Sequence, residues 1–123
     1  MPDLREVANI NEFKPGTMKA VNVEGHEYLI ARVENMYYAA DNHCPHMGGV
    51  LSQGKLEGTV ITCPRHASQF DLKDGHTIRW TNWSPALVAV DQVRSRRRPL
   101  PIYPVVVEGD KILIDKVGVL VNR

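Results

Sequence analysis

Several features that mark particular classes of protein are scarce in this sequence. The 123-residue chain has only two cysteines and two phenylalanines, and its 15 basic residues nearly balance its 14 acidic ones, which leaves a net charge of +1 at pH 7. So few cysteines exclude the disulfide-dense scaffold of small secreted domains. The balanced charge excludes the strongly basic surface that is typical of nucleic-acid-binding domains.

Long apolar runs are also lacking. A helix that crosses a bilayer needs about twenty consecutive apolar residues, and no such stretch is present. The chain begins Met-Pro-Asp-Leu-Arg-Glu, which has neither the apolar core of a signal peptide nor a twin-arginine pair. We therefore expect a cytoplasmic protein that does not insert into a membrane.

The residues that are present indicate one globular domain. The chain is 43% hydrophobic and 24% charged, and it contains nine glycines. This composition is that of a folded globular protein rather than of a disordered or fibrous one. A mass of 13.8 kDa suits a single domain, so residues 1–123 are expected to form one unit.

β-prone segments separated by turn signals dominate the chain. A hairpin is predicted at Glu24-Gly25, and a second one at Glu108-Gly109-Asp110. The expected strands are Thr17–Val23, His26–Val33, Met36–Ala40, Lys55–Thr62, Gln69–Leu72, Ile102–Val107 and Lys111–Asp115. The pattern predicts an all-β fold, a small antiparallel sandwich or barrel.

One segment departs from the β pattern. Ser84 is suited to cap a helix, Pro85 suits its first turn, and apolar residues recur at helical intervals through Val93. We therefore predict one short helix within residues 84–98.

Both cysteines belong to a repeated pattern of metal-ligand residues. Cys44 and His46 form a C-x-H motif, sixteen residues follow, and Cys63 and His66 form a C-x-x-H motif. Thiolate sulfur and imidazole nitrogen suit zinc or an iron-sulfur cluster, and they suit calcium or magnesium poorly. The sequence therefore predicts a four-ligand metal site on two loops.

The spacing leaves open whether the site holds one metal or two. Mononuclear zinc sites usually pair two cysteines on one turn and two histidines on another. Here each loop supplies one of each, so that each loop would straddle a cluster with both cysteines at one iron and both histidines at the other. Mixed loops favour a [2Fe-2S] cluster without proving it.

The two motifs resemble those of the Rieske proteins, and especially of the Rieske-type ferredoxins that supply electrons to ring-hydroxylating oxygenases. The resemblance rests on CPHMGG at Cys44–Gly49 and CPRHASQFDLKDG at Cys63–Gly75, and it extends from about Thr17 to Asp115. It implies a Rieske-like antiparallel β-sandwich or barrel with two cluster-binding loops. It also implies one [2Fe-2S] cluster per chain and a role as electron carrier rather than as enzyme.

The resemblance further implies a ligand set. Cys44 and Cys63 would bind one iron, and His46 and His66 the other. Two neutral histidine ligands leave the oxidised cluster uncharged, so it accepts an electron more readily than an all-cysteine cluster, and Rieske potentials span about −150 to +300 mV. Residues expected around the ligands are Met47, Gly48, Gly49, Ala67, Ser68 and Pro85.

Other residues near the motifs have less specific interpretations. His43 has no ligand counterpart in the family, so it lies either beside the site or on the surface, and His26 and His76 are expected in solvated turns. Asp71 and Asp74 are expected to serve a strand end and a turn. Four apolar side chains form either a docking rim or part of the core: Met47, Val50, Leu51 and Trp83.

The chain also departs from the family's high-potential members. Those proteins have an additional cysteine in each loop, where this chain has Gly49 and Arg65. Ser68 is retained, but Phe70 replaces a tyrosine and offers no hydroxyl, so a low to intermediate potential is expected. Residues 87–98 form an insertion relative to the small ferredoxins.

Three functions remain in view. The leading hypothesis is a carrier between a flavin-containing reductase and a terminal oxygenase. The second is the small subunit of a larger oxidoreductase, such as an assimilatory nitrite reductase. The third is a zinc-stabilised structural domain without a redox role.

Overall fold

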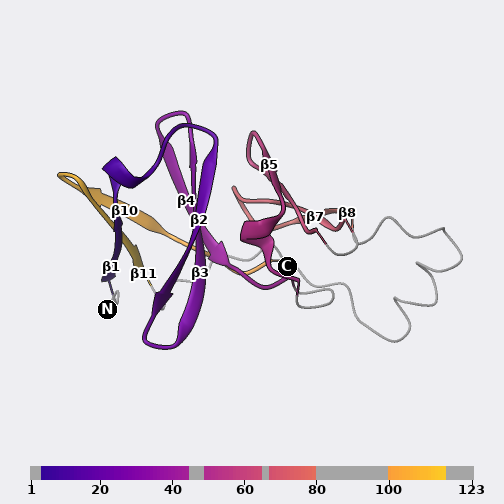
Figure 1. Ribbon diagram of the computed structural model, residues 1–123, viewed down its shortest axis with the longest axis horizontal. Helices are drawn as coiled ribbons and strands as arrows, with labels where there is room; N and C mark the ends of the chain where they lie inside the picture. Colours follow the sequence, from indigo (N-terminus) through magenta and orange to yellow (C-terminus); the bar gives the residue numbers. More distant parts are fainter. Residues whose placement is uncertain (1–3, 45–48, 65–66, 80–99, 116–123) are drawn as a thin grey trace, which may run out of the picture.

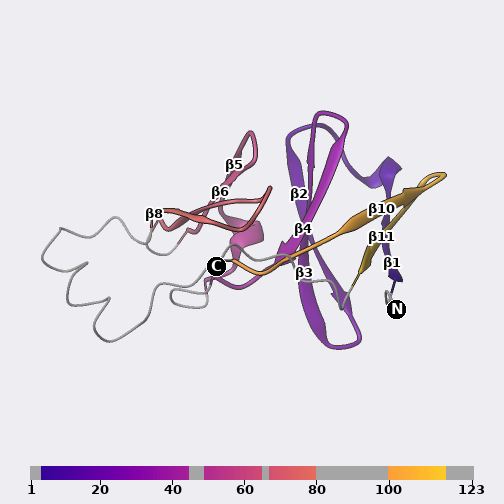
Figure 2. The same ribbon diagram turned by 180° about the vertical axis from the view of Figure 1, so that it is seen from behind.

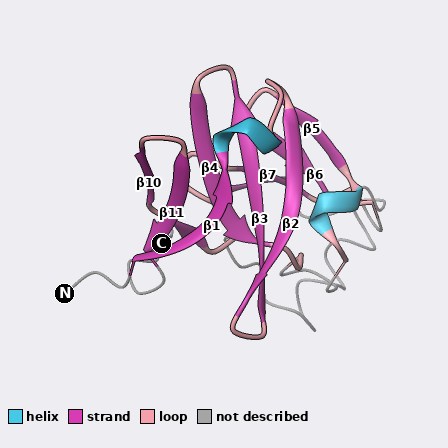
Figure 3. Cartoon of the chain, turned by 60° about the vertical axis from the view of Figure 1, so that its left-hand side comes forward, coloured by secondary structure: helices cyan, strands magenta, loops and turns pink. Residues whose placement is uncertain are grey.

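The computed structural model describes residues 4–44, 49–64, 67–79 and 100–115, and these residues form mostly β-strands. Figure 3 shows two short helical turns among them, the 3₁₀ segments η1 (Ile10–Glu12) and η2 (Leu51–Gln53). Within this part of the chain every pair of strands is antiparallel. The all-β antiparallel prediction is confirmed.

The central sheet has the order β2-β3-β4-β9. It contains β2 (Thr17–Val23), β3 (His26–Val33), β4 (Met36–Asp41) and β9 (Ile102–Tyr103). The hairpin predicted at Glu24-Gly25 is confirmed, and both turn residues have positive φ angles, 53° and 87°. Such a turn matches the right-handed twist of the flanking strands.

Strand β3 is buried on both of its faces. Successive side chains of a strand point to opposite sides. Leu29 and Ala31 accordingly belong to one buried cluster, while Tyr28 and Ile30 belong to another. The central sheet is therefore covered on both sides, as the unbroken apolar run of β3 requires.

The second sheet carries the two cysteine loops and has the order β5-β6-β7-β8. It contains β5 (Lys55–Glu57), β6 (Val60–Thr62), β7 (Gln69–Asp71) and β8 (Thr77–Arg79). The prediction of one strand over Lys55–Thr62 is wrong, because the chain turns at Gly58, whose φ is +60°, and β5 pairs back onto β6. Glycine adopts that conformation without the steric cost of a side chain.

The third sheet has the order β1-β11-β10. It contains β1 (Leu4–Asn9), β10 (Val105–Glu108) and β11 (Lys111–Asp115), and the hairpin predicted at Glu108–Asp110 is confirmed. The single strand expected over Ile102–Val107 is wrong. Pro104 has no N–H to donate, and it divides the segment into β9 in the central sheet and β10 in the third.

The central sheet stands between the other two, as Figures 1 and 2 show from opposite sides. One buried cluster fills the space toward the β5–β8 sheet and includes Leu29, Cys44, Cys63 and Phe70. The other lies toward the β1-β11-β10 sheet and includes Phe13, Tyr28 and Ile112. Both cysteines therefore lie in the same core region, the one between the central sheet and the β5–β8 sheet.

Two neighbouring strands of the central sheet are joined by the cysteine-bearing part of the chain. β4 pairs directly with β9 through Ala39 with Tyr103 and Ala40 with Ile102. The chain between these strands, from residue 42 to residue 101, thus leaves the central sheet at one point and returns beside it. The whole β5–β8 sheet lies within this excursion.

The helix predicted within residues 84–98 lies outside the described residues. Where the structure does describe the chain, no helix combines the length and the apolar composition that crossing a membrane would require.

Candidate metal centre

Cys44 lies just beyond the end of β4 in a narrow loop. Its side chain is buried, and its backbone N–H donates to the carbonyl oxygen of Gly49 at 2.8 Å. One step nearer the strand, His43 and Val50 form an isolated antiparallel bridge. The loop is therefore held as a short continuation of a two-stranded ladder.

Cys63 occupies the same place at the end of β6. It is buried, and its N–H donates to the carbonyl oxygen of Ser68 at 2.8 Å. The chain turns back through Ala67, which has a left-handed φ of 57° and donates its own N–H to the Cys63 carbonyl at 3.1 Å. The second loop is thus also closed at its base.

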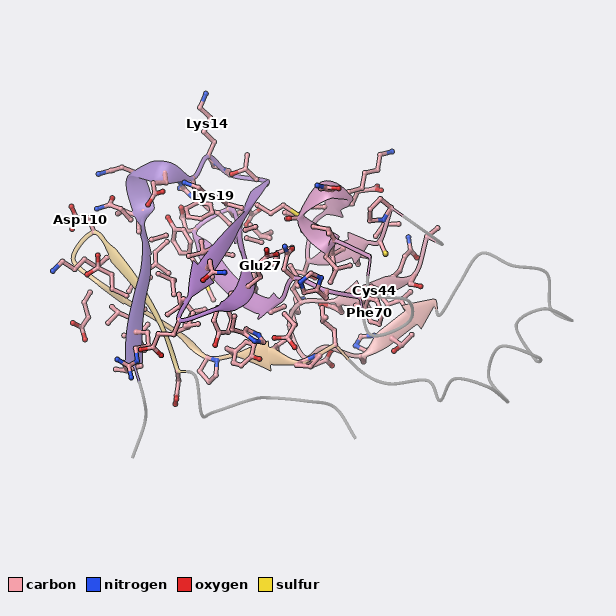
Figure 4. The ribbon with its side chains drawn as sticks, turned by 60° about the horizontal axis from the view of Figure 1, so that its bottom comes forward. Lys14, Lys19, Glu27, Cys44, Phe70 and Asp110 are labelled. Carbon is pink, nitrogen blue, oxygen red and sulfur yellow. The ribbon has the colours of Figure 1, made fainter. Side chains whose placement is uncertain are left out.

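The two loops are closed by the same hydrogen-bond pattern. In each, the N–H of the cysteine bonds to the carbonyl of the fifth residue after it, and each cysteine directly follows a strand or strand-like stem. Neither thiol forms a disulfide, and both belong to the core cluster that contains Phe70, beside which Figure 4 shows Cys44. Two equivalent loops therefore bring two thiols to one buried layer.

Two of the four predicted ligands, His46 and His66, lie outside the described residues, as do three of the residues expected around the ligands, Met47, Gly48 and Pro85. Gly49 and Ser68 are buried, and their carbonyls close the two loops. Among the residues that the structure describes, no group of three or more His, Cys, Asp or Glu side chains is placed to hold a metal ion. The four-residue ligand set thus remains a prediction.

The three histidines outside the ligand set each lie near a carboxylate. His43 is exposed, with Nε2 3.7 Å from Glu27 Oε1. His76 Nδ1 lies 2.6 Å from Asp74 Oδ1, and His26 Nε2 lies 2.7 Å from Asp41 Oδ1. His43 accordingly lies on the surface. His26 and His76 are partly exposed, at 49% and 41% of their side chains, which agrees with the expected solvation, although His26 is the first residue of β3 rather than a turn residue.

The two aspartates have the structural roles expected of them. Asp71 Oδ1 accepts from the Lys73 N–H, and Asp74 Oδ1 accepts from the His76 N–H. The bond from the His76 N–H, together with the interaction with the His76 ring, lowers the pKa of Asp74 below its ordinary value. Both carboxylates stabilise the β7–β8 connection.

Asp41 lies at the end of β4, just before the first loop, and links β4 to β3 and β9. This role was not predicted from the sequence. Its Oδ1 accepts from the Tyr103 hydroxyl at 2.6 Å and is also bonded by His26. Burial and the bond to Asp41 raise the pKa of Tyr103 above its usual range, because both favour the neutral phenol. The Tyr28 ring packs against both partners, with centroids at 4.5 Å from His26 and 5.0 Å from Tyr103.

The structure describes two of the four apolar residues that were expected either in a docking rim or in the core. Leu51 is completely buried in the core cluster with the cysteines, so for this residue the docking-rim interpretation is wrong. Val50 is partly buried, and Met47 and Trp83 lie outside the described residues.

The described residues fit a Rieske cluster. Two thiols that are buried, outside any disulfide and delivered by equivalent loops form half of the expected donor set. Thiolates are the ligands that iron-sulfur clusters require, and burial limits access of water and oxidants to them. The resemblance and the fold thus point to the same pair of loops.

Known proteins resemble this chain in sequence and in structure. Residues 3–104 match the family described as Rieske [2Fe-2S] domain. The ferredoxin component of a naphthalene 1,2-dioxygenase system from Pseudomonas aeruginosa is 35% identical over 104 residues, covering 85% of this chain and 86% of the relative. The ferredoxin of carbazole 1,9a-dioxygenase from Nocardioides aromaticivorans IC177 superposes with a TM-score of 0.74 at 29% identity, covering 91% and 96% of the two chains.

A second solved structure adds a partner on the relative's side. It is a complex of reduced oxygenase and oxidised ferredoxin in carbazole 1,9a-dioxygenase, and its matching chain has a TM-score of 0.72 at 27% identity. The match covers 91% of this chain and 92% of that one.

Proposed function

The chain belongs to the family of Rieske [2Fe-2S] domains, and on this premise we propose that Cys44 and Cys63 bind one iron of the cluster while His46 and His66 bind the other. In the proposed role the protein is a one-electron carrier that receives an electron from a flavin-containing reductase and delivers it to the terminal oxygenase of a ring-hydroxylating system. It carries electrons and does not itself transform a substrate.

The observation that supports this assignment most directly is the equivalence of the two cysteine loops. Each cysteine is buried, follows a strand or its extension, and closes its loop onto the fifth residue after it. A bound [2Fe-2S] cluster supplies one reversible electron transfer. The chain's own part is to hold two thiolates at fixed positions, to exclude water from them, and to present histidines from the same loops.

The ligand assignment is tested by variants of the cysteines and of all five histidines. Electron paramagnetic resonance of the dithionite-reduced protein, with iron and acid-labile sulfide assayed on the same sample, should give a rhombic S = 1/2 signal. Its average g value should be lower than that of all-cysteine clusters.

We expect Cys44→Ser, Cys63→Ser, His46→Ala and His66→Ala to lose that signal. The matched controls are His26→Ala, His43→Ala and His76→Ala, which should retain both iron and signal. A parent protein that contains zinc and gives no signal would overturn the assignment, as would an equal loss of iron from ligand and control variants.

The proposed acceptor is supported by the carbazole dioxygenase complex, in which a structurally similar ferredoxin is bound to an oxygenase. The test mixes the reduced protein with the oxygenase component of a naphthalene or carbazole dioxygenase and follows reoxidation by stopped-flow absorbance. Saturable transfer that depends on oxygenase concentration is the expected result. Absence of transfer, together with tight co-purification with a large oxidoreductase subunit, would favour the alternative role as a small subunit.

The cytoplasmic location expected from the sequence stays a prediction. Fractionation of the source cells, followed by immunoblotting of each fraction, would check it. Recovery outside the cytoplasmic fraction would contradict it.

A further inference from the structure

Asn42 is a completely buried polar residue that lies between β4 and the first cysteine loop. Burying an amide costs free energy unless its polar atoms find hydrogen-bond partners. In this case the partners are present, because no buried side-chain nitrogen or oxygen among the described residues lacks one. The hydrogen bonds of Asn42 therefore offset the cost of burying its amide.

Asn42 bonds in two opposite directions. Toward β3, its Nδ2 donates to Glu27 Oε1 at 2.9 Å and its backbone N–H donates to the Glu27 carbonyl at 3.3 Å. Toward the far side of the loop, its Oδ1 accepts from the Ser52 N–H at 2.9 Å, and its carbonyl accepts from the Leu51 N–H at 2.7 Å. The residue thus ties the returning stem of the loop to the central sheet.

These bonds form the base of a ladder that ends at the cysteine. Asn42 faces Leu51, then His43 forms a bridge with Val50, and then Cys44 bonds to Gly49. A change in separation at the base is transmitted through two further pairs to Cys44. Asn42 accordingly controls how far apart the two stems of this loop lie.

The second loop does not need such a residue. Its stems are β6 and β7, which are paired through Thr62 and Gln69 and are flanked by β5 and β8. In the first loop only the outgoing stem follows a strand, because Gly49 and Val50 belong to no named strand and η2 follows them. The Asn42 side chain supplies hydrogen bonds that a neighbouring strand supplies in the second loop.

We propose that Asn42 is a positioning residue for the cluster, with Glu27 as its anchor, which sets the geometry of Cys44 and hence the retention and the potential of the metal. The inference rests on the proposed role of Cys44 as a ligand. It adds a supporting role for two residues that lie outside both metal-binding motifs, Glu27 on β3 and Asn42 directly after β4.

The test exchanges the two ends of the side-chain hydrogen bond. Asn42→Asp removes the amide donor and places a second carboxylate against Glu27, so we expect chelator-induced loss of iron to accelerate by about tenfold or more. Glu27→Gln keeps an oxygen acceptor and removes a charge, so iron loss should change little while the reduction potential rises, because a nearby negative charge disfavours the added electron.

The double substitution Glu27→Gln with Asn42→Asp provides the rescue. The amide introduced at position 27 donates to the carboxylate introduced at position 42, so the bond is restored with its polarity reversed and the net charge unchanged. We expect iron retention and the visible circular dichroism of the cluster to return to within about twofold of the parent. The control is Glu57→Gln, which removes an exposed carboxylate from β5 and should leave iron retention and potential unchanged.

Hydrogen exchange on the metal-free protein separates this inference from the ligand assignment. In Asn42→Asp the backbone amides of Leu51, Ser52 and Cys44 should exchange faster than in the parent, and the double substitution should restore their protection. If iron retention, potential and exchange in Asn42→Asp and Asn42→Ala equal those of the parent, the positioning role is overturned. It is also overturned if the double variant loses iron as fast as Asn42→Asp does.

Discussion

At the scale of single residues, buried or half-buried polar groups hold together the strands that lead into the first cysteine loop. Asp41 binds Tyr103 of β9 and His26 of β3 through one carboxylate oxygen. Its backbone N–H also donates to the Pro101 carbonyl at 3.1 Å. The end of β4 is therefore fixed to both of its neighbouring strands.

Tyr103→Phe tests this network through pH. Because the pKa of Tyr103 is raised in the folded protein, its neutral form contributes stability that is fully present below the unfolded pKa of about 10 and is lost as pH rises above that value. We expect the parent to lose stability more steeply than Tyr103→Phe between about pH 9 and pH 12. Urea unfolding at stepped pH measures this. Tyr38→Phe is the control, and parallel pH profiles for the parent and Tyr103→Phe would contradict the prediction.

Phe70 offers a second test at this scale. It is completely buried in the cluster that contains both cysteines. We expect Phe70→Tyr to place a hydroxyl within reach of the metal centre and to raise the equilibrium constant for reduction by up to about tenfold, which is about 59 mV for one electron. Voltammetry measures the shift. Phe13→Tyr adds the same hydroxyl to the other core and should leave the potential unchanged, so equal shifts in both variants would refute the proximity effect.

At the scale of elements, the turn between β7 and β8 is fastened to the segment that returns to the central sheet. The Leu100 N–H donates to the Gly75 carbonyl at 2.8 Å, and Leu100 is fully buried. A Cβ added at Gly75 would lie 2.1 Å from the Leu100 carbonyl oxygen. This contact permits no side chain and sets the point at which the chain re-enters the core.

Gly75→Ala should therefore be far more destabilising than an ordinary turn substitution. The matched control is Gly109→Ala, because Gly109 also has a positive φ, 63° against 79°, but has nothing within 4 Å of an added Cβ. The control should cost about 1–2 kcal/mol for the left-handed conformation alone. Gly75→Ala should cost clearly more, since the Leu100 backbone must move. Urea unfolding compares the two variants, and equal costs would show that the Leu100 contact yields easily.

Turn chemistry made the strands of two hairpins predictable, and the two segments that were wrongly predicted as single strands have physical causes. The strands β1 and β8 were not predicted. The turns at residues 24–25 and 108–110 each contain a glycine, which adopts a positive φ without steric cost, and both hairpins were predicted. The Gly58 turn was missed because the segment around it alternates in polarity as one strand would. Pro104 was missed as a boundary because proline at a strand edge is tolerated, and only pairing with different sheets reveals the division.

The candidate site was predictable only where residue type alone carries the chemistry. Cysteine and histidine at C-x-H and C-x-x-H spacing announce a metal site without knowledge of the fold. Asn42 and Asp41 carry no such signal, because Asx residues after a strand are ordinary turn formers. Their importance depends on Glu27, Ser52 and Tyr103, which are distant in sequence and approach only after the sheets assemble.

At the scale of the whole molecule, the two core regions differ in their cysteine content. The cluster that includes Phe70 and Leu51 contains both cysteines, and the cluster that includes Phe13 and Ile112 contains neither. Figure 4 shows the end that contains Cys44 well separated from the opposite end around Asp110. Metal binding should therefore stabilise one part of the protein more than the other.

Removal of the cluster tests this division. We expect metal-free protein to show amide hydrogen exchange that is faster by at least about tenfold in β6 and β7 but little changed in β1 and β11. Mass spectrometry of peptic fragments measures exchange in each strand. Equal acceleration in all three sheets would show that the two cores unfold as one unit.

The direct pairing of β4 with β9 also has a consequence for the evolution of such a protein. Because the chain from residue 42 to residue 101 departs from and returns to neighbouring strands, recombination at two points that are far apart in the sequence but close in the fold can exchange the entire cysteine-bearing part at once. The remaining sheets would keep their own pairing and their own core. The two cysteine loops and the sheet that supports them would thus be inherited together as one unit.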